Sequence, residues 1–279
     1  MKLAIIILSG DTPEILFRCF AGIRENVKFE YKIYLAYNGR DAAVESQIRA
    51  HLEATFRAEQ YKVVKYSFYN FAALNNDIVR NHLDQGFELL LFCNNDVVIH
   101  GDAVNQMAHQ MSRNPKLFGT IGCRLLFENG LIQHDGQALS VWKDGTFRGV
   151  THFNLHRDPA TVALPMRLVI GNTFALCVST LEVFNLVGGL NQIYKNCFED
   201  VEYNLQCLLA GRINVTLESN HFSHHLESYS RKNSESTARI DPDDVKRLTT
   251  FINSRILVAA QLVIRTDELP SDRTTNDGS

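Results

Sequence analysis

The chain has 279 residues, of which 45% are hydrophobic and 21% charged, and its formal net charge is −3. These proportions exclude a disordered or fibrous protein, and the length is sufficient to bury a large core. The slightly acidic balance lacks the excess of basic residues that nucleic-acid-binding proteins use to contact phosphates, so no nucleic acid is expected as a partner.

The cysteines are widely spaced, contain no CxxC pair and lie mostly in apolar segments, as is typical of reduced core thiols in a cytoplasmic protein. They are Cys19, Cys93, Cys123, Cys177, Cys197 and Cys207. No apolar run approaches the roughly 20 residues of a membrane span. The N-terminal "LAIIIL" is too short for the apolar region of a signal peptide. We therefore expect a cytoplasmic protein.

Up to about residue 126, short apolar runs alternate with amphipathic segments. Strands are expected at 3–8, 32–37, 61–66, 88–93 and 118–127. Helices are expected between them, the first beginning at Pro13 with Thr12 as its N-cap and the third running from Phe71 to Leu83. Strands separated by helices of this length predict right-handed crossovers and a mostly parallel sheet covered on both faces.

After residue 126 the regular alternation ends. The stretch 128–165 is rich in Gly, His and polar residues and is expected to form hairpins and a long loop over the sheet edge. One strand is expected over 167–179, a helix over about 199–210 and a strand over 213–218. A last helix begins near Asp241, and its apolar residues share one face: Val245, Leu248, Ile252, Ile256, Ala259 and Val263.

Three polar residues, Asn94, Asn95 and Asp96, directly follow the apolar run "ELLLFC". Ligands bind at the carboxyl ends of strands in parallel sheets, so this triplet stands where a ligand would lie. A carboxylate beside two amides can hold a divalent cation together with the phosphates of a substrate. The same residue types favour turns and helix caps, and the triplet alone is explained as well by a polar turn.

Two acids, Glu199 and Asp200, occupy the first turn of the expected helix 199–210. A carboxylate there can act as a general base if it reaches an acceptor hydroxyl. Acids in a first turn also stabilise the helix dipole, and taken alone this is the simpler explanation.

The segment "HFSHHLESYSR" (221–231) follows the strand expected at 213–218. His224 or His225 could supply a nitrogen ligand to the same cation, and Arg231 could bind phosphate oxygens through its planar guanidinium. The spacing is not that of a zinc site. Each of these features is weak evidence on its own.

The order and spacing of all three features resemble the inverting family-2 glycosyltransferases of the GT-A fold, especially those that build bacterial surface polysaccharides. The resemblance covers most of residues 3–231. It runs through "YNG" (37–39), "NFAALNN" (70–76), "ELLLFCNND", "GTIGCRLLFENGLIQHDGQAL" (119–139), "VIGNTFALCVSTLEVFNLVGGLN" (169–191), "FEDVEYNLQCLLAGR" and "HLESYSR".

This resemblance implies an α/β protein with a Rossmann-like GT-A domain in residues 1–231, divided into a nucleotide-binding half (about 1–126) and an acceptor-binding half (about 127–231). A linker and amphipathic helix (232–266) and a disordered tail (267–279) would follow. The implied activity is a metal-dependent, inverting transfer of a sugar from a nucleoside-diphosphate sugar to a hydroxyl of a glycan or lipid-linked acceptor. Mn²⁺ or Mg²⁺ would be the cofactor, and capsule or O-antigen synthesis the setting.

The resemblance also implies roles for single residues. Asp96 corresponds to the metal ligand, assisted by His225 or His224, and Asp200 to the catalytic base, with Glu199 beside it near the acceptor. The residues expected to bind the nucleotide and its diphosphate are Ser9, Gly10, Asn38, Asn94, Asn95 and Arg231.

Three positions depart from the family pattern. Tyr37 stands where an Asp usually precedes "NG", Asn94 replaces the first acid of the metal motif, and Glu202 replaces an Asp. The first two keep open a catalytically inactive sugar-nucleotide-binding subunit. A sugar-phosphate nucleotidyltransferase is another alternative, although "LSGDTPE" (8–14) is not the Gly-rich phosphate loop that such an enzyme needs after its first strand.

The last helix carries Lys246, Arg247, Arg255 and Arg265 around its apolar face. It could rest on the anionic inner face of a membrane, where a lipid-linked acceptor is found, or it could pack on the catalytic domain or a second subunit. The donor sugar, the nucleotide, the acceptor and the oligomeric state are not predicted by the sequence.

Overall fold

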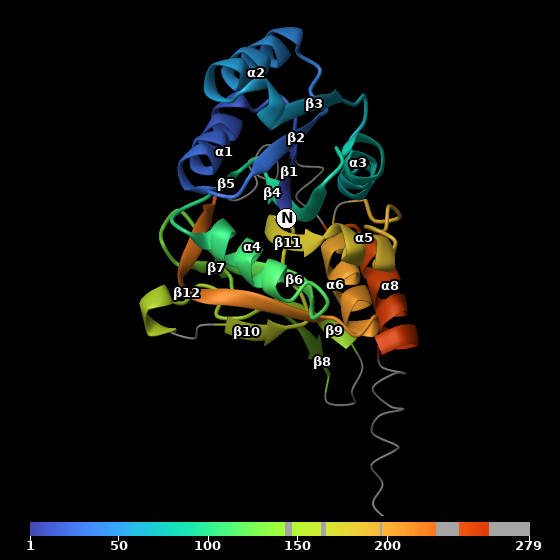
Figure 1. Cartoon of the computed structure of the whole chain (residues 1–279). Coiled ribbons are helices and arrows are strands. Elements are labelled where there is room, and N and C mark those ends of the chain that lie inside the picture. Colours follow the sequence, from blue (N-terminus) through green and yellow to red (C-terminus); the bar gives the residue numbers. More distant parts are fainter. Residues whose placement is uncertain (143–146, 163–165, 196, 227–239, 257–279) are drawn as a thin grey trace, which may run out of the picture.

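The computed structural model describes residues 1–142, 147–162, 166–195, 197–226 and 240–256. These residues form an α/β protein built around a central sheet (Figure 1). Its strand order is β10-β12-β6-β11-β4-β1-β2-β3, with β5 added to β12 and β7 to β6, and a separate ribbon pairs β8 with β9. Neighbours β1, β2, β3 and β4 are parallel, whereas β11 is antiparallel to both β4 and β6. The sheet is therefore mixed but mostly parallel, as expected.

The strands are β1 (Lys2–Ser9), β2 (Tyr31–Tyr37), β3 (Tyr61–Lys65), β4 (Phe87–Asn94), β5 (Val97–Val98), β6 (Phe118–Leu126), β7 (Ile132–His134), β8 (Gln137–Val141), β9 (Phe147–His152), β10 (Met166–Val169), β11 (Leu176–Thr180) and β12 (Ile213–His225). The helices are α1 (Pro13–Asn26), α2 (Ala42–Thr55), α3 (Phe71–Asp77), α4 (Ala103–Arg113), α5 (Leu181–Val187), α6 (Glu199–Leu209) and α8 (Pro242–Phe251). A π-helical turn continues α3 to His82, and another continues α8 to Ile256.

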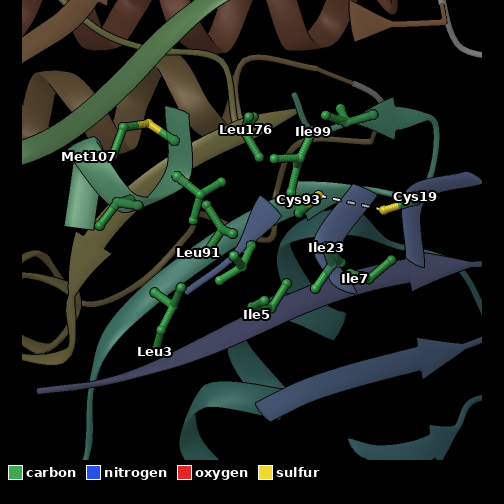
Figure 2. Packing of buried hydrophobic residues seen from close by; sticks show 14 of the residues in the cluster. Leu3, Ile5, Ile7, Cys19, Ile23, Leu91, Cys93, Ile99, Met107 and Leu176 are labelled. Carbon is green, nitrogen blue, oxygen red and sulfur yellow. Dashed lines mark hydrogen bonds between the residues drawn. The ribbon is translucent and has the colours of Figure 1, made fainter. Parts of the chain in front are cut away.

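Two apolar cores lie on opposite faces of the sheet. The first joins β1 and β4 to α1, α2 and α4, and the second joins the other face of these strands to α3, α5 and α6. Figure 2 shows part of the first core, where Cys19 of α1 and Cys93 of β4 approach to 3.9 Å between their Sγ atoms as free thiols. Because helices cover both faces, β1 and β4 are buried almost throughout, which explains their unbroken apolar sequences.

The expected single strand over 167–179 is wrong. The structure has two strands there, β10 at the sheet edge beside β12 and β11 between β6 and β4, with an irregular segment at 170–175 between them. Apolar residues continue through the break because Phe174 and Ala175 are buried in loop rather than in strand. Continuous apolarity reports burial and does not separate a strand from a buried connection.

The expected strand over 213–218 is too short. β12 extends to His225 and pairs with β6 in parallel and with β5 in antiparallel fashion. Its register against β6 shifts between Leu217 and Phe222, where five steps along β12 oppose one step along β6. Residues 219–221, beyond the expected end of the strand, therefore lie in a bulge within it.

The last helix packs on the protein. Leu248 and Ile252 are buried against α6 and Tyr194, whereas Val245, expected on the same face, is 41% exposed. The packing alternative therefore holds for residues 242–256; Ala259, Val263, Arg265 and the expected tail lie outside the described residues. Among the residues described, no helix combines the length and apolar composition needed to cross a bilayer.

Ile252→Ala is expected to lower the free energy of unfolding by about 2–4 kcal/mol, because it removes a fully buried side chain from the contact between α8 and α6. Val245→Ala, on the same helix but exposed, is the control and should cost under about 0.5 kcal/mol. Urea unfolding followed by circular dichroism measures both. Equal effects of the two changes would mean that α8 does not pack as described.

Candidate functional site

The carboxyl ends of β1, β2 and β4 bring the residues expected to bind the nucleotide together. The Asn95 amide donates to the Ser9 hydroxyl at 3.1 Å and to the Thr12 hydroxyl at 3.0 Å, and the Asn38 backbone N–H donates to the Ser9 carbonyl at 3.0 Å. Asn94 ends β4 opposite Leu8 of β1. Thr12 lies at the N-cap of α1, as expected, but its side chain makes no cap bond and contacts Asn95 instead.

Gly10 lies beside Asn38, because a Cβ built on it would be 3.7 Å from the Asn38 Oδ1 atom. Arg231 lies outside the described residues.

Tyr37, which replaces the usual Asp, is buried and donates its hydroxyl to the Asp11 carboxylate at 2.6 Å. Asp11 also accepts the backbone N–H groups of Arg40 and Asp41. Burial alone would raise the pKa of Asp11, but the hydrogen bond from Tyr37 and those two N–H groups outweigh it and lower the pKa. The Asp11 carboxylate thus lies beside the position of the usual Asp, but it comes from the loop after β1 rather than from the end of β2. The sequence placed the loop from Ser9 to Asp11 beside Asn38, but it did not indicate that Tyr37 reaches Asp11.

Asp96 and His225 meet in space although they are far apart in the chain. The Asp96 Oδ1 atom is 3.1 Å from the His225 Nε2 atom, and the two side chains are only 6% and 15% exposed. This contact does not have the alignment of a hydrogen bond, and neither atom has a hydrogen-bond partner among the described residues. A carboxylate oxygen and a ring nitrogen this close, neither of them hydrogen-bonded, suit a shared third partner.

The strand register separates the two candidate histidines. His225 pairs with Val97 and His224 with Val98, and neighbouring residues on a strand point to opposite faces of the sheet. His225 consequently faces Asp96, whereas the His224 ring packs edge-on against His100 at 4.8 Å between centroids. The geometry favours His225 over His224 as the partner of Asp96.

Gln133 orients the His225 ring. Its Oε1 atom is 2.7 Å from the His225 Nδ1 atom. An amide oxygen can only accept, so Nδ1 carries a proton, and in the neutral ring Nε2 presents its lone pair toward Asp96. Metal-bound histidines are held in this way by an acceptor on their other nitrogen. Gln133 was not among the expected site residues; the only signal was its place in the "GLIQHDG" stretch.

The donor set fits a divalent cation that is held jointly with a substrate. At metal–ligand distances of about 2.1 Å, two ligands at right angles are about 3 Å apart, close to the separation of Asp96 Oδ1 and His225 Nε2, 3.1 Å. Within the described residues no group of three His, Cys, Asp or Glu side chains could enclose a metal ion. Water or diphosphate oxygens could complete the coordination.

Asp200 lies in the first turn of α6, next to the segment that separates β10 from β11. Its Oδ2 atom accepts the backbone N–H of Phe174 at 3.4 Å, and its Oδ1 atom that of Val201 at 2.7 Å. Glu199 beside it is buried, at 9% exposure. The preceding residue, Phe198, has a φ of 80°, a left-handed conformation that costs a bulky residue about 1–3 kcal/mol and is concentrated at functional sites.

A buried amide network fixes α6 against this segment. The fully buried Asn204 donates to the Asp200 carbonyl at 2.7 Å and to the Asn172 carbonyl at 2.9 Å. It accepts the Asn172 backbone N–H at 3.2 Å and the Thr120 hydroxyl at 2.6 Å. All four bonds of its amide are made, so the first turn of α6 and the segment 172–174 hold one relative position.

The two parts of the site are linked through residues 170–175. The Asn94 backbone N–H donates to the Ala175 carbonyl at 2.8 Å, and the preceding residue, Phe174, donates its backbone N–H to Asp200. The Asp96–His225 pair and the expected base, Asp200, are therefore carried by adjoining elements.

Two hollows of about 530 and 400 Å³ lie elsewhere on the protein. They follow α6 where it faces α8 and the 187–192 loop, and both are lined by Asn191 and Glu202 rather than by Asp96.

Known proteins include a distant relative of this chain and solved structures with a similar fold. No family model matches the chain. The O-antigen biosynthesis protein RfbC of Myxococcus xanthus is 27% identical over 237 residues, which cover 83% of this chain and 18% of RfbC. The chain thus spans less than a fifth of that relative.

Solved structures share the architecture. GalNAc-T7, crystallised with UDP, GalNAc and Mn²⁺, superposes with a TM-score of 0.67 at 9% identity over 90% of this chain and 48% of its own. TarS of S. aureus matches with a TM-score of 0.55 at 12% identity over 82% of this chain and 37% of its own. The chain is a distant homologue of RfbC and has the GT-A glycosyltransferase fold.

Proposed function

We propose that this protein is a metal-assisted, inverting glycosyltransferase that moves a sugar from a nucleoside-diphosphate sugar to a hydroxyl of a glycan or lipid-linked acceptor. The observation that carries the proposal is the Asp96–His225 pair, 3.1 Å apart and unaligned as a hydrogen bond, beside the amides of β4's end. The relationship to RfbC supports O-antigen or similar surface-polysaccharide synthesis as the setting.

Asp200 is the general base of the proposed reaction. It takes the proton of the acceptor hydroxyl while that oxygen forms a bond to the anomeric carbon. The bond from the anomeric carbon to the diphosphate breaks on the opposite face, and its electron pair leaves with the diphosphate. Phe174 and Asn204 hold the carboxylate and its helix turn in place, which supports this role because reacting groups must be pre-positioned.

Asp96 and His225 would hold a divalent cation, and Ser9, Asn38 and Asn95 would bind the nucleotide beside it. When bound, the cation would neutralise charge on the departing phosphates. His225 can do this only with Nε2 unprotonated, the state that Gln133 favours.

The open alternatives are weaker. A nucleotidyltransferase would need a phosphate loop after β1, whereas the Ser9 hydroxyl there contacts Asn95. The second alternative, a catalytically inactive subunit, rests on Tyr37 and Asn94, which depart from the family pattern. Asp11 places a carboxylate beside Tyr37, which supports the active enzyme at one of these two positions.

Asp96→Asn and His225→Ala are each expected to abolish the Mn²⁺-dependent part of the thermal stabilisation that the donor gives. A ligand at 100 times its dissociation constant adds about 2.7 kcal/mol to the stability, so the loss is measurable as a fall in Tm. The assay screens UDP-N-acetylglucosamine, UDP-galactose, GDP-mannose and dTDP-rhamnose with Mn²⁺ and with EDTA.

His224→Ala is the matched control, because it removes the same side chain one residue away on the other face of β12. It should retain the Mn²⁺-dependent shift. If His224→Ala loses the shift and His225→Ala keeps it, the assignment of the metal ligand is wrong. If none of the four donors stabilises the wild-type protein with Mn²⁺, the proposed donor class is contradicted.

A further inference from the structure

Two histidines outside the proposed metal site form a close pair between β7 and β9. The Nδ1 atoms of His134 and His152 are 2.8 Å apart, and the rings meet edge to face at 73°. The Nε2 atom of His134 accepts the backbone N–H of Thr173 at 3.4 Å. His134 is buried at 2% exposure, whereas His152 is exposed. The pair gives each ring a defined proton position.

The backbone N–H of Thr173 can only donate, so His134 Nε2 carries a lone pair. A neutral imidazole has one N–H, and that proton is therefore on Nδ1 of His134. His134 donates it to Nδ1 of His152, which must be an acceptor. The proton of the His152 ring is then on Nε2.

Both rings are neutral near pH 7, as this arrangement requires. Burial, and secondarily repulsion from His152, lower the pKa of His134 well below its usual range, outweighing the Asn172 amide beside it. Partial burial of the ring also lowers the pKa of His152, although the residue as a whole is exposed.

The pair stands next to the proposed base. Thr173, which contacts His134, directly precedes Phe174, whose N–H contacts Asp200. On its other side, His134 follows Gln133, which orients His225. The His152 Nε2 atom has no hydrogen-bond partner among the described residues. His152, an exposed residue, thus carries an N–H donor one ring away from the segment 173–174 that contacts the proposed base.

We propose, resting on the proposed function, that His152 donates a hydrogen bond through Nε2–H to an oxygen of the acceptor saccharide and that His134 positions this donor. His152 is an acceptor-binding residue in this scheme and takes no part in proton transfer. Sugar hydroxyl and ring oxygens are acceptors that a neutral imidazole N–H can bind. The role of His134 is to fix the tautomer of His152 by donating a hydrogen bond to its Nδ1 atom.

The tautomer is tested without any ligand. In ¹⁵N-histidine-labelled protein, long-range ¹H–¹⁵N spectra distinguish a ring nitrogen that bears a proton from one with a lone pair. His152 is expected to show a protonated Nε2 and an unprotonated Nδ1 at pH 7.5, and His134 the reverse. A protonated Nδ1 on His152 would overturn the proposal.

Two substitutions separate substrate binding from structure. In His152→Asn the side-chain oxygen can replace the Nδ1 acceptor and keep the bond from His134, but the outward N–H is lost. In His152→Gln the side-chain amide can replace the Nε2–H donor, but the acceptor for His134 is lost. We expect His152→Asn to lower kcat/KM for the acceptor about two- to tenfold, the worth of one hydrogen bond, and His152→Gln to retain more of it.

A purely structural role would reverse this order, because the Asn variant keeps the internal bond and the Gln variant breaks it. Donor hydrolysis without acceptor should be the same in both variants and the wild type. If it falls together with transfer, the bond is to the donor sugar and the acceptor assignment is wrong. The acceptor probes are the octyl glycosides of glucose, galactose, rhamnose and N-acetylglucosamine.

Failure of the proposed function gives a different result. If no probe is glycosylated, the same glycosides are titrated into labelled protein and the His152 Nε2–H resonance is followed. A shift of that resonance that is lost in His152→Asn supports the contact in the absence of turnover. If the glycosides bind, as seen by shifts elsewhere in the spectrum, and the His152 resonance does not move, the contact is refuted.

Discussion

Asp200→Asn is expected to lower the rate of sugar transfer by about 10²–10⁴-fold, the usual worth of a general base, while donor binding stays unchanged. Asparagine keeps the size of the side chain and can still accept the N–H of Phe174, but it cannot take the acceptor's proton. The rate is measured as formation of glycosylated product, and donor binding as the Mn²⁺-dependent Tm shift.

Glu199→Gln is the control for this experiment, because it neutralises the neighbouring acid of the same helical turn. It is expected to reduce transfer much less than Asp200→Asn does. If Glu199→Gln is the inactive variant and Asp200→Asn is active, the base has been assigned to the wrong acid. If both are fully active, neither carboxylate abstracts the proton.

Arg124→Met is expected to lower the free energy of unfolding by about 3–5 kcal/mol, because it leaves a buried carboxylate without its counter-charge. Arg124 and Asp135 are 1% and 0% exposed and are joined by two bonds, Nε to Oδ1 at 2.9 Å and Nη2 to Oδ2 at 3.1 Å. Arg124 also donates to the Val162 carbonyl at 3.1 Å, so the pair anchors the connection that follows β9.

Arg49→Met is the matched control. Arg49 pairs with Glu45 at 2.9 Å on the exposed face of α2, where an ion pair is worth about 0–1 kcal/mol. The double variant Arg124→Met, Asp135→Leu should recover part of the loss, because both charges are then absent. Urea unfolding at pH 7 measures all three. A loss below about 1 kcal/mol in Arg124→Met would contradict a tightly paired, dry site.

The first half of the fold was predictable because each of its elements carries a local signal. The apolar runs of β1 and β4 report burial directly, and the boundaries of both strands fall within one residue of those expected. The second half was less predictable, since β10 and β11 form one apolar stretch in sequence but occupy distant places in the sheet. No local pattern encodes which strand a segment will join.

The candidate site residues were predictable from the sequence, but the residues that hold them in position were not. The motifs indicated Asp96, Asp200 and a histidine, and the structure brings Asp96 to His225 and carries Asp200 on an adjoining element. The roles of these residues remain predictions. Gln133 and Asn204 were not identified, and His134 and His152 were assigned no role, because each acts through a contact with a residue distant in sequence.

The bulge in β12 has a consequence for comparing this chain with its relatives. Because side chains alternate along a strand, the number of residues between Leu217 and Phe222 decides which of the two adjacent imidazoles faces the carboxylate of Asp96. Losing or gaining one residue there would exchange His224 and His225 without altering either. In a homologue whose bulge differs in length by an odd number of residues, a sequence alignment that matches the histidines would therefore assign the wrong one as the partner of the Asp96 carboxylate.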